Sequence, residues 1–131
     1  APPEGEELST EKNSKGTLMN NFVVYNVALE LVRTLRPIVA ELRNHSSNIA
    51  DQIERAGTSL VLNLGEGNRR AGKDRRRFFV MAQGSASEIL AALDVADAWG
   101  WIVDAQTVRA LLDRERALLW GLVHPRVQPH G

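Results

Sequence analysis

Hydrophobic residues recur along this chain with the period of an α-helix. From Asn21 to Leu42, apolar side chains follow one another at steps of three and four residues, which places them on one helical face. The same spacing returns from Ile49 to Leu64, and again in a last segment that stops before Pro125. No strand-like alternation with a period of two competes with it. The pattern therefore predicts an all-α chain.

Capping and turn residues indicate where the second helix begins and ends. His45–Asn48 offers Ser and Asn side chains that can accept hydrogen bonds from the free amides of a new helix. Gly65 and Gly67 then predict the end of that helix, because glycine tolerates the left-handed conformation common at helix C-termini. We expect a turn from there to Gly72.

The third and fourth helices follow the same logic. The third is expected over residues 73–98 and is closed by a glycine, while Asp104 can cap the fourth. Three tryptophans lie near the ends of these segments, and we expect them to seal one end of the fold: Trp99, Trp101 and Trp120.

The chain divides into one folded domain and two tails. Residues 1–19 are polar, rich in Glu, Gly, Pro and Ser, and lack a helical period, so a flexible acidic tail is expected there. Residues 20–123 hold the four amphipathic segments, whose short connections predict an antiparallel, up-down-up-down four-helix bundle. Residues 124–131 form a C-terminal tail.

The third helix is apolar on two sides. Its main stripe consists of Phe78, Ala82, Ile89, Leu93 and Ala96. At about 100° per residue, the opposite face is also small and apolar, and it consists of Val80, Gly84, Ala91, Val95 and Ala98. Such a face is poorly suited to water. We therefore expect it to contact another copy of the protein in a homo-oligomer.

Composition adds a few exclusions. The 131 residues suffice for one domain with a core. The absence of cysteine excludes disulfides and thiolate chemistry. No apolar run approaches the roughly 20 residues of a membrane span, and the N-terminal residues lack a signal pattern, so we expect a cytoplasmic protein without membrane contact.

The segment Asn68–Phe79, NRRAGKDRRRFF, holds six cations offset only by Asp74. They are Arg69, Arg70, Lys73, Arg75, Arg76 and Arg77. A solvated surface is one explanation, but cations in a first helical turn oppose the macrodipole, at about 0.3–1 kcal/mol each. Arginine forks and helix N-terminal amides suit phosphate, so we predict contacts with a nucleic-acid backbone. Arg33, Arg36 and Arg43 would extend this surface.

Catalytic and metal-binding patterns are absent from the sequence. Glu66 and Glu88 could form a carboxylate pair, but no Glu-x-x-His completes a di-iron site. We interpret them, with Asn63 and Ser85, as structural. The histidines do not form a zinc motif, which commonly includes Cys: His45, His124 and His130. The sequence predicts no catalytic residue, cofactor or metal, and hence no enzyme.

Three segments resemble the bacterial four helix bundle protein family, also called the 23S rRNA intervening-sequence protein family. They are Asp51–Gly67 (DQIERAGTSLVLNLGEG), Lys73–Phe79 (KDRRRFF) and Gly84–Ile102 (GSASEILAALDVADAWGWI). The resemblance covers about residues 20–123. Val61 stands where the family has proline, and Gly65 stands where it has alanine.

The resemblance implies a short up-down bundle that closes into a homopentamer and has no established enzymatic activity. A related branch, the accessory proteins of diversity-generating retroelements, forms basic pentameric barrels that bind RNA and a reverse transcriptase. RNA and a reverse transcriptase are therefore the partners that the resemblance suggests. The alternative is a protein-interaction scaffold that binds no nucleic acid, in which the arginines pair across subunits with Asp94, Asp97 or Asp104.

Overall fold

The computed structural model describes residues 4–101 and 104–125, with side chains from residue 20 onward. It consists of the helices α1 (Glu4–Leu42), α2 (Ser47–Arg69), α3 (Gly72–Ala98) and α4 (Gln106–Val123). No strand occurs within these ranges. The all-α fold predicted from the periodicity is confirmed, with four helices.

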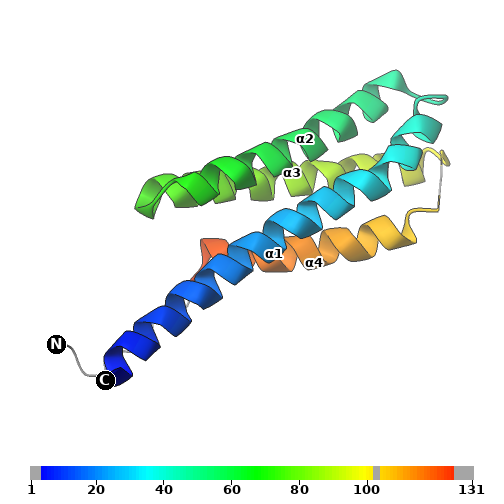
Figure 1. Ribbon diagram of the computed structural model, residues 1–131. Coiled ribbons are helices and arrows are strands. Elements are labelled where there is room, and N and C mark those ends of the chain that lie inside the picture. The colour runs from blue at the N-terminus through cyan, green and yellow to red at the C-terminus, as the bar shows by residue number, and fades with distance from the viewer. Residues whose placement is uncertain (1–3, 102–103, 126–131) are drawn as a thin grey trace.

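The helices form a bundle in which each one contacts two neighbours. α2 packs against α1 and α3, and α4 packs against the same two helices. The α2–α3 connection lies at one end of the bundle, which we call the basic end (Figure 1). The α1–α2 and α3–α4 connections lie together at the other end, which we call the aromatic end because His45, Trp99 and Trp101 lie there.

α1 is longer than the hydrophobic pattern indicated. It begins at Glu4, whereas the apolar period begins only near Asn21, and it continues through Pro37. Its first turns extend beyond the other helices (Figure 1). Glu, Lys, Leu and Met favour helix even without an apolar face to bury, so periodicity alone misses this segment. The flexibility expected for residues 1–19 stays a prediction.

The end of α2 differs from the prediction. Gly65 and Gly67 do not end the helix, which continues to Arg69, and the left-handed glycine is Gly72, with φ 61°. Gly67 is buried against α3, where an added Cβ would lie only 2.6 Å from Cε1 of Phe79. Glycine is therefore required at position 67 for close packing of two helices, not for a turn.

Two predicted caps are confirmed. Ser46 Oγ accepts a hydrogen bond from the Ile49 amide at 3.1 Å and caps α2. At the end of α3, Gly100 has φ 76° and Trp101 N donates to Ala96 O at 2.9 Å, which is the Schellman pattern. This cap turns the chain back and fixes Trp101 over the last turn of α3.

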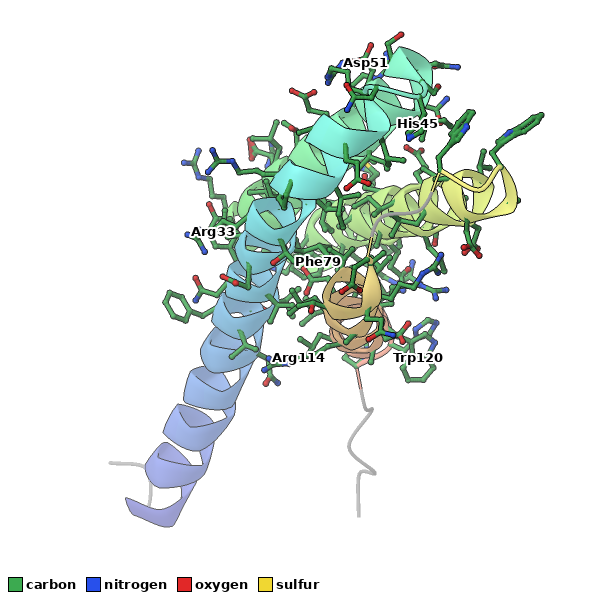
Figure 2. The ribbon with its side chains drawn as sticks, turned by 90° about the vertical axis from the view of Figure 1, so that its right-hand side faces the viewer. Arg33, His45, Asp51, Phe79, Arg114 and Trp120 are labelled. Atoms are coloured by element: carbon green, nitrogen blue, oxygen red, sulfur yellow. The ribbon has the colours of Figure 1, made fainter. Side chains whose placement is uncertain are left out.

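The core is built from apolar residues of all four helices. The largest fully buried apolar side chains are Leu31, Leu42, Ile53, Leu60, Leu64, Ile89, Leu112 and Leu119. Phe79, not Phe78, begins the buried stripe of α3, and its side chain points between the helices (Figure 2). One charged residue, Glu115, lies at a core position of α4 and is fully buried.

The tryptophans do not seal one end of the bundle as expected. Trp99 is 69% exposed at the aromatic end, while Trp120, 60% exposed, projects outward from α4 (Figure 2). Trp101 is half-buried. Tryptophan is large enough to contribute apolar area to a surface as well as to a core, so composition could not decide its place.

Among the described helices, only α3 is long and apolar enough by composition to cross a membrane. A core helix of a soluble bundle passes the same test, and α3 contributes many buried residues to this core. The feature is therefore weak evidence for a membrane.

Candidate nucleic-acid interface and oligomer surface

The six cations of Asn68–Phe79, which we call the basic run, lie at the basic end, on both sides of the α2–α3 connection. Arg69 is the last residue of α2, Arg70 follows it, and the other four occupy the first turns of α3. All are at least partly exposed. The structure thus brings these predicted residues together on one end of the bundle.

Two of these arginines bond to the C-terminal carbonyls of neighbouring helices. Arg75 Nε donates to Gly67 O at 3.1 Å, and Arg75 Nη2 lies 3.5 Å from Asn68 O, both in the last turn of α2. Arg76 Nε donates to Val123 O, the last residue of α4, at 3.3 Å. Helix C-termini carry unpaired carbonyls and partial negative charge, which cations stabilise.

The helix macrodipole therefore does not count against Arg75 and Arg76 in this structure. Arg75 and Arg76 oppose the dipole of their own helix, but they complement those of α2 and α4. A structural reason therefore exists for both residues. The sequence did not reveal it because Val123 is 47 residues away from Arg76.

Arg70 and Arg77 form a local network around one carboxylate. Asp74 accepts hydrogen bonds from Arg70 at 2.9 Å and from Arg77 at 3.0 Å, and Glu66 lies 3.7 Å from Arg70. The hydrogen bond from Arg77, and to a smaller extent that from Arg70, lowers the pKa of Asp74. Both guanidinium groups also lie over Phe78, with 5.3 and 4.8 Å between Cζ and the ring centroid.

Arg69 and Lys73 are the least engaged members of the run. Both are exposed, and neither forms an ion pair with any side chain that the structure describes. The Arg77 side chain is 61% exposed in spite of its bond to Asp74. These three residues therefore offer the most accessible positive charge at the basic end.

The three cations expected to extend this surface, Arg33, Arg36 and Arg43, do not join the cluster. Arg43 follows α1 at the aromatic end, where it binds Asp51 at 2.8 Å and Glu54 at 2.7 Å. The hydrogen bond to Asp51 is the main reason that the pKa of Arg43 is raised. Arg33 pairs with Glu30 at 3.3 Å, and Arg36 is exposed further along the same helix.

The apolar outer face of α3 is open to solvent in the single chain. Val80 and Val95 are 41% and 40% exposed, and a Cβ added to Gly84 would meet nothing within 4 Å. Ala91 and Ala98 are also exposed. Other large apolar residues are also exposed, namely Met81 on α3 itself, Leu62 on α2 and Trp120 on α4. The face thus lacks intramolecular cover, as its prediction as an oligomer contact requires.

Polar side chains of α2 and α3 form hydrogen bonds that link the two helices. Asn63 Nδ2 donates to Ser59 Oγ at 3.0 Å, and Ser85 Oγ bonds to the same hydroxyl at 3.0 Å from across the helix interface. Glu66 pairs with Arg70, and Glu88 is exposed. Within the described ranges, no group of three or more His, Asp or Glu side chains is placed to hold a metal ion; His130 lies outside them.

Glu115 is a feature that the sequence analysis missed. Both carboxylate oxygens are buried without a hydrogen-bond partner among the described residues. Burial raises the pKa of this carboxyl to about 8, and the opposing effect of Arg114 is smaller. A carboxyl at a core position of an amphipathic helix was the available signal, because such positions are almost always apolar.

These features define a small four-helix bundle protein with a cationic end and an uncovered apolar face on its third helix. The family model described as 23S rRNA-intervening sequence protein matches residues 20–120. The chain therefore belongs to that family, as its motifs indicated.

The fold is also found in a solved structure. A protein of unknown function from the S23 ribosomal protein family of Bacteroides thetaiotaomicron is similar, with a TM-score of 0.72 and 21% sequence identity over 80% of this chain and 98% of that chain. At this identity the likeness supports the fold alone. No curated protein matches the chain.

Proposed function

We propose that this protein is a non-enzymatic, antiparallel helical bundle that assembles into a homo-oligomeric ring and associates with RNA through its basic end. The observation that carries the proposal is the clustering of six cations at one end, with Arg69, Lys73 and Arg77 accessible to solvent. Membership of a family named for 23S rRNA intervening sequences agrees with RNA as the partner.

The capping bonds divide the cations by role. Arg75 and Arg76 hold helix ends, so their loss would reduce stability as well as binding. Arg69, Lys73 and Arg77, with Arg70 beside them, are the residues proposed to contact phosphates. Arginine binds phosphate oxygens in a bidentate fork, and this contact depends on charge and position, not on base sequence.

Assembly would strengthen this interaction. In a ring, each copy adds its own basic end to a shared surface, and the summed potential exceeds that of one subunit. The exposed face of α3 supplies a contact for such a ring, and the pentamer implied by the family resemblance is the size that we propose. Each neutralised phosphate then contributes a salt-dependent term, with a slope near −0.9 on duplex and about −0.7 on single strands.

A filter-binding titration with structured RNA at low and moderate salt tests the proposal. The triple variant R69Q/K73Q/R77Q should lose most of its affinity and reduce the salt slope by about two to three contacts. The matched control is R33Q/R36Q/R114Q, which removes the same charge from exposed positions of α1 and α4. Both variants need the wild-type mass in light scattering. Equal binding by the two triples, or no binding at low salt, would sink the proposal.

A second candidate is a protein-interaction scaffold without nucleic-acid affinity. It is favoured by the intramolecular use of Arg70, Arg75, Arg76 and Arg77, because a cation already bound to a carbonyl or carboxylate has less need of phosphate. The same titration separates the two candidates. The scaffold predicts a stable oligomer that ignores RNA at every salt concentration.

A further inference from the structure

The aromatic end carries a stack of three rings with an open outer face. His45 and Trp101 lie with ring centroids 6.0 Å apart and planes 12° from parallel, and Trp99 and Trp101 lie 5.8 Å apart at 14°. Trp101 is therefore the shared ring of two offset stacks. Trp99, at 69% exposure, presents its indole to solvent at the edge of the stack.

The backbone holds this stack in place. Trp99 caps α3, Gly100 takes the left-handed conformation, and the amide of Trp101 bonds to Ala96 O. Figure 2 views the bundle from this end and shows His45 beside the last turn of α1. The rings come from the α1–α2 and α3–α4 connections, so the surface is pre-organised by the fold and not by a ligand.

The charge beside the stack is negative. Asp97 and Asp104 line a cleft of about 250 Å³ together with Trp101, and neither carboxylate forms an ion pair among the described residues. Among the residues that the structure describes, Asp104 Oδ1 accepts only the Gln106 amide, at 3.3 Å. Arg109 also lines the cleft, but its guanidinium is bound to Asp94 at 3.0 Å. Two carboxylates therefore remain for an incoming cation.

Apart from Gln106, the rest of the cleft is apolar. Its walls come from α1, α3 and the segment before α4, and they include Ile38, Leu42, Leu93 and Ala96. Trp101 thus joins the exposed Trp99 indole to a cleft that holds two carboxylates and an apolar recess, at the end of the bundle opposite the six cations.

We propose that the aromatic end is a docking surface for a partner protein that presents an arginine next to an apolar side chain. A guanidinium is planar, weakly hydrated and permanently charged, so it can stack on Trp99 while Asp97 or Asp104 binds its N–H groups. The apolar neighbour enters the recess lined by Leu42 and Leu93. Aromatic rings can also stack nucleobases, but the two carboxylates repel a phosphate backbone, so charge favours a basic peptide over RNA.

Tryptophan fluorescence provides the test. The full chain carrying Trp120→Phe has tryptophan only at the aromatic end, so a change of emission reports binding there. The probe is the peptide acetyl-Leu-Arg-Leu-amide. Its matched control has citrulline in place of arginine, which keeps the planar group and removes the charge. The arginine peptide should give a saturable change, and the citrulline peptide should bind at least about threefold more weakly.

Variants locate the site. Trp99→Ala should weaken binding of the arginine peptide about two- to fivefold, with Trp101 still reporting, and D97N/D104N should weaken it by at least as much. The matched control, Asp113→Asn, removes a carboxylate from an exposed position of α4 and should leave binding unchanged. Because these positions lie far from the basic end, all of these variants should retain the RNA binding proposed for that end.

Several outcomes would overturn the proposal. These are no saturable change up to about 10 mM peptide, equal binding of the arginine and citrulline peptides, or a stronger response to polyuridine than to the arginine peptide. A fall in the oligomer mass of D97N/D104N would also overturn it, because it would assign this end to the arginines of a second copy of the chain.

Discussion

Arg76 Nε donates a hydrogen bond to the carbonyl oxygen of Val123, and this 3.3 Å contact joins the start of α3 to the end of α4. Arg75 makes the equivalent contact with the end of α2. The basic run is therefore part of the architecture at the point where three helix ends meet. The structural role of these two arginines is therefore distinct from the accessible positive charge of the neighbouring cations.

Replacing Arg76 with Gln should destabilise the bundle by about 1 kcal/mol, since it removes a charged donor from a helix C-terminus that is only partly shielded from water. The measurement is the free energy of unfolding from urea denaturation. Arg69→Gln is the matched control, and it should change that free energy by less than about 0.5 kcal/mol. Equal effects of the two changes would show that the contact with Val123 contributes nothing to stability.

Gly67→Ala should also lower the free energy of unfolding, but for a different reason. The new Cβ would overlap the ring of Phe79 and approach Cβ of Phe78 at 3.3 Å, so we expect a loss of about 1–3 kcal/mol in the free energy of unfolding. At Gly121, where nothing lies within 4 Å, the same change should be neutral or stabilising by up to about 1 kcal/mol. Adding Phe79→Leu to Gly67→Ala should recover part of the loss. If Gly67→Ala behaves like Gly121→Ala, the close packing of α2 on α3 is wrong.

The oligomer contact can be tested with one charge. Ala91 is exposed in the isolated subunit, so Ala91→Glu should fold normally but bury an unpaired carboxylate in the proposed contact. Light scattering should then report a smaller mass than for the wild type. Ala40→Glu, the same change at an exposed alanine of α1, should retain the wild-type mass. An unchanged mass for Ala91→Glu would show that this face is not the contact.

The sequence was sufficient for features that depend on local patterns. Apolar period, Ser46 and Gly100 predicted the helix type and two of the caps, because these depend on residues within a few positions of one another. It failed where a distant residue decides the outcome. Gly67 predicted a turn, but in the structure it makes room for Phe79. Arg76 was predicted to bind phosphate, but in the structure it donates a hydrogen bond to Val123.

The candidate sites divide in the same way. Clustering of the six cations followed from their positions in the chain, but which of them remain accessible depended on Asp74 and on two helix ends. The stack of His45 with Trp101 could not be predicted, because it joins two connections that are distant in sequence. Periodicity indicates which face is apolar, but not which apolar residues stay exposed.

Glu115 gives the fold a dependence on pH. Its pKa is about 8 in the folded protein and about 4.5 when exposed, so the folded state holds a proton that the unfolded state has released between these values. The unfolded state binds fewer protons, and the free energy of unfolding therefore falls as the pH rises from about 4.5 to about 8. The slope expected from this one group is about 1.4 kcal/mol per pH unit, and the fall ends above its folded pKa.

Glu115→Gln tests this dependence because it keeps the shape of the side chain and removes its titration. The free energy of unfolding, measured in urea at several values between pH 5 and pH 9, should decline less steeply for E115Q than for the wild type. At pH 8 the variant should be the more stable of the two, and Glu115→Leu should be more stable again, because it buries no unpaired polar atom. The matched control is Glu88→Gln, at an exposed position of α3, which should follow the wild-type curve. Parallel curves for wild type and E115Q would mean that the carboxyl of Glu115 reaches water or a proton donor in solution.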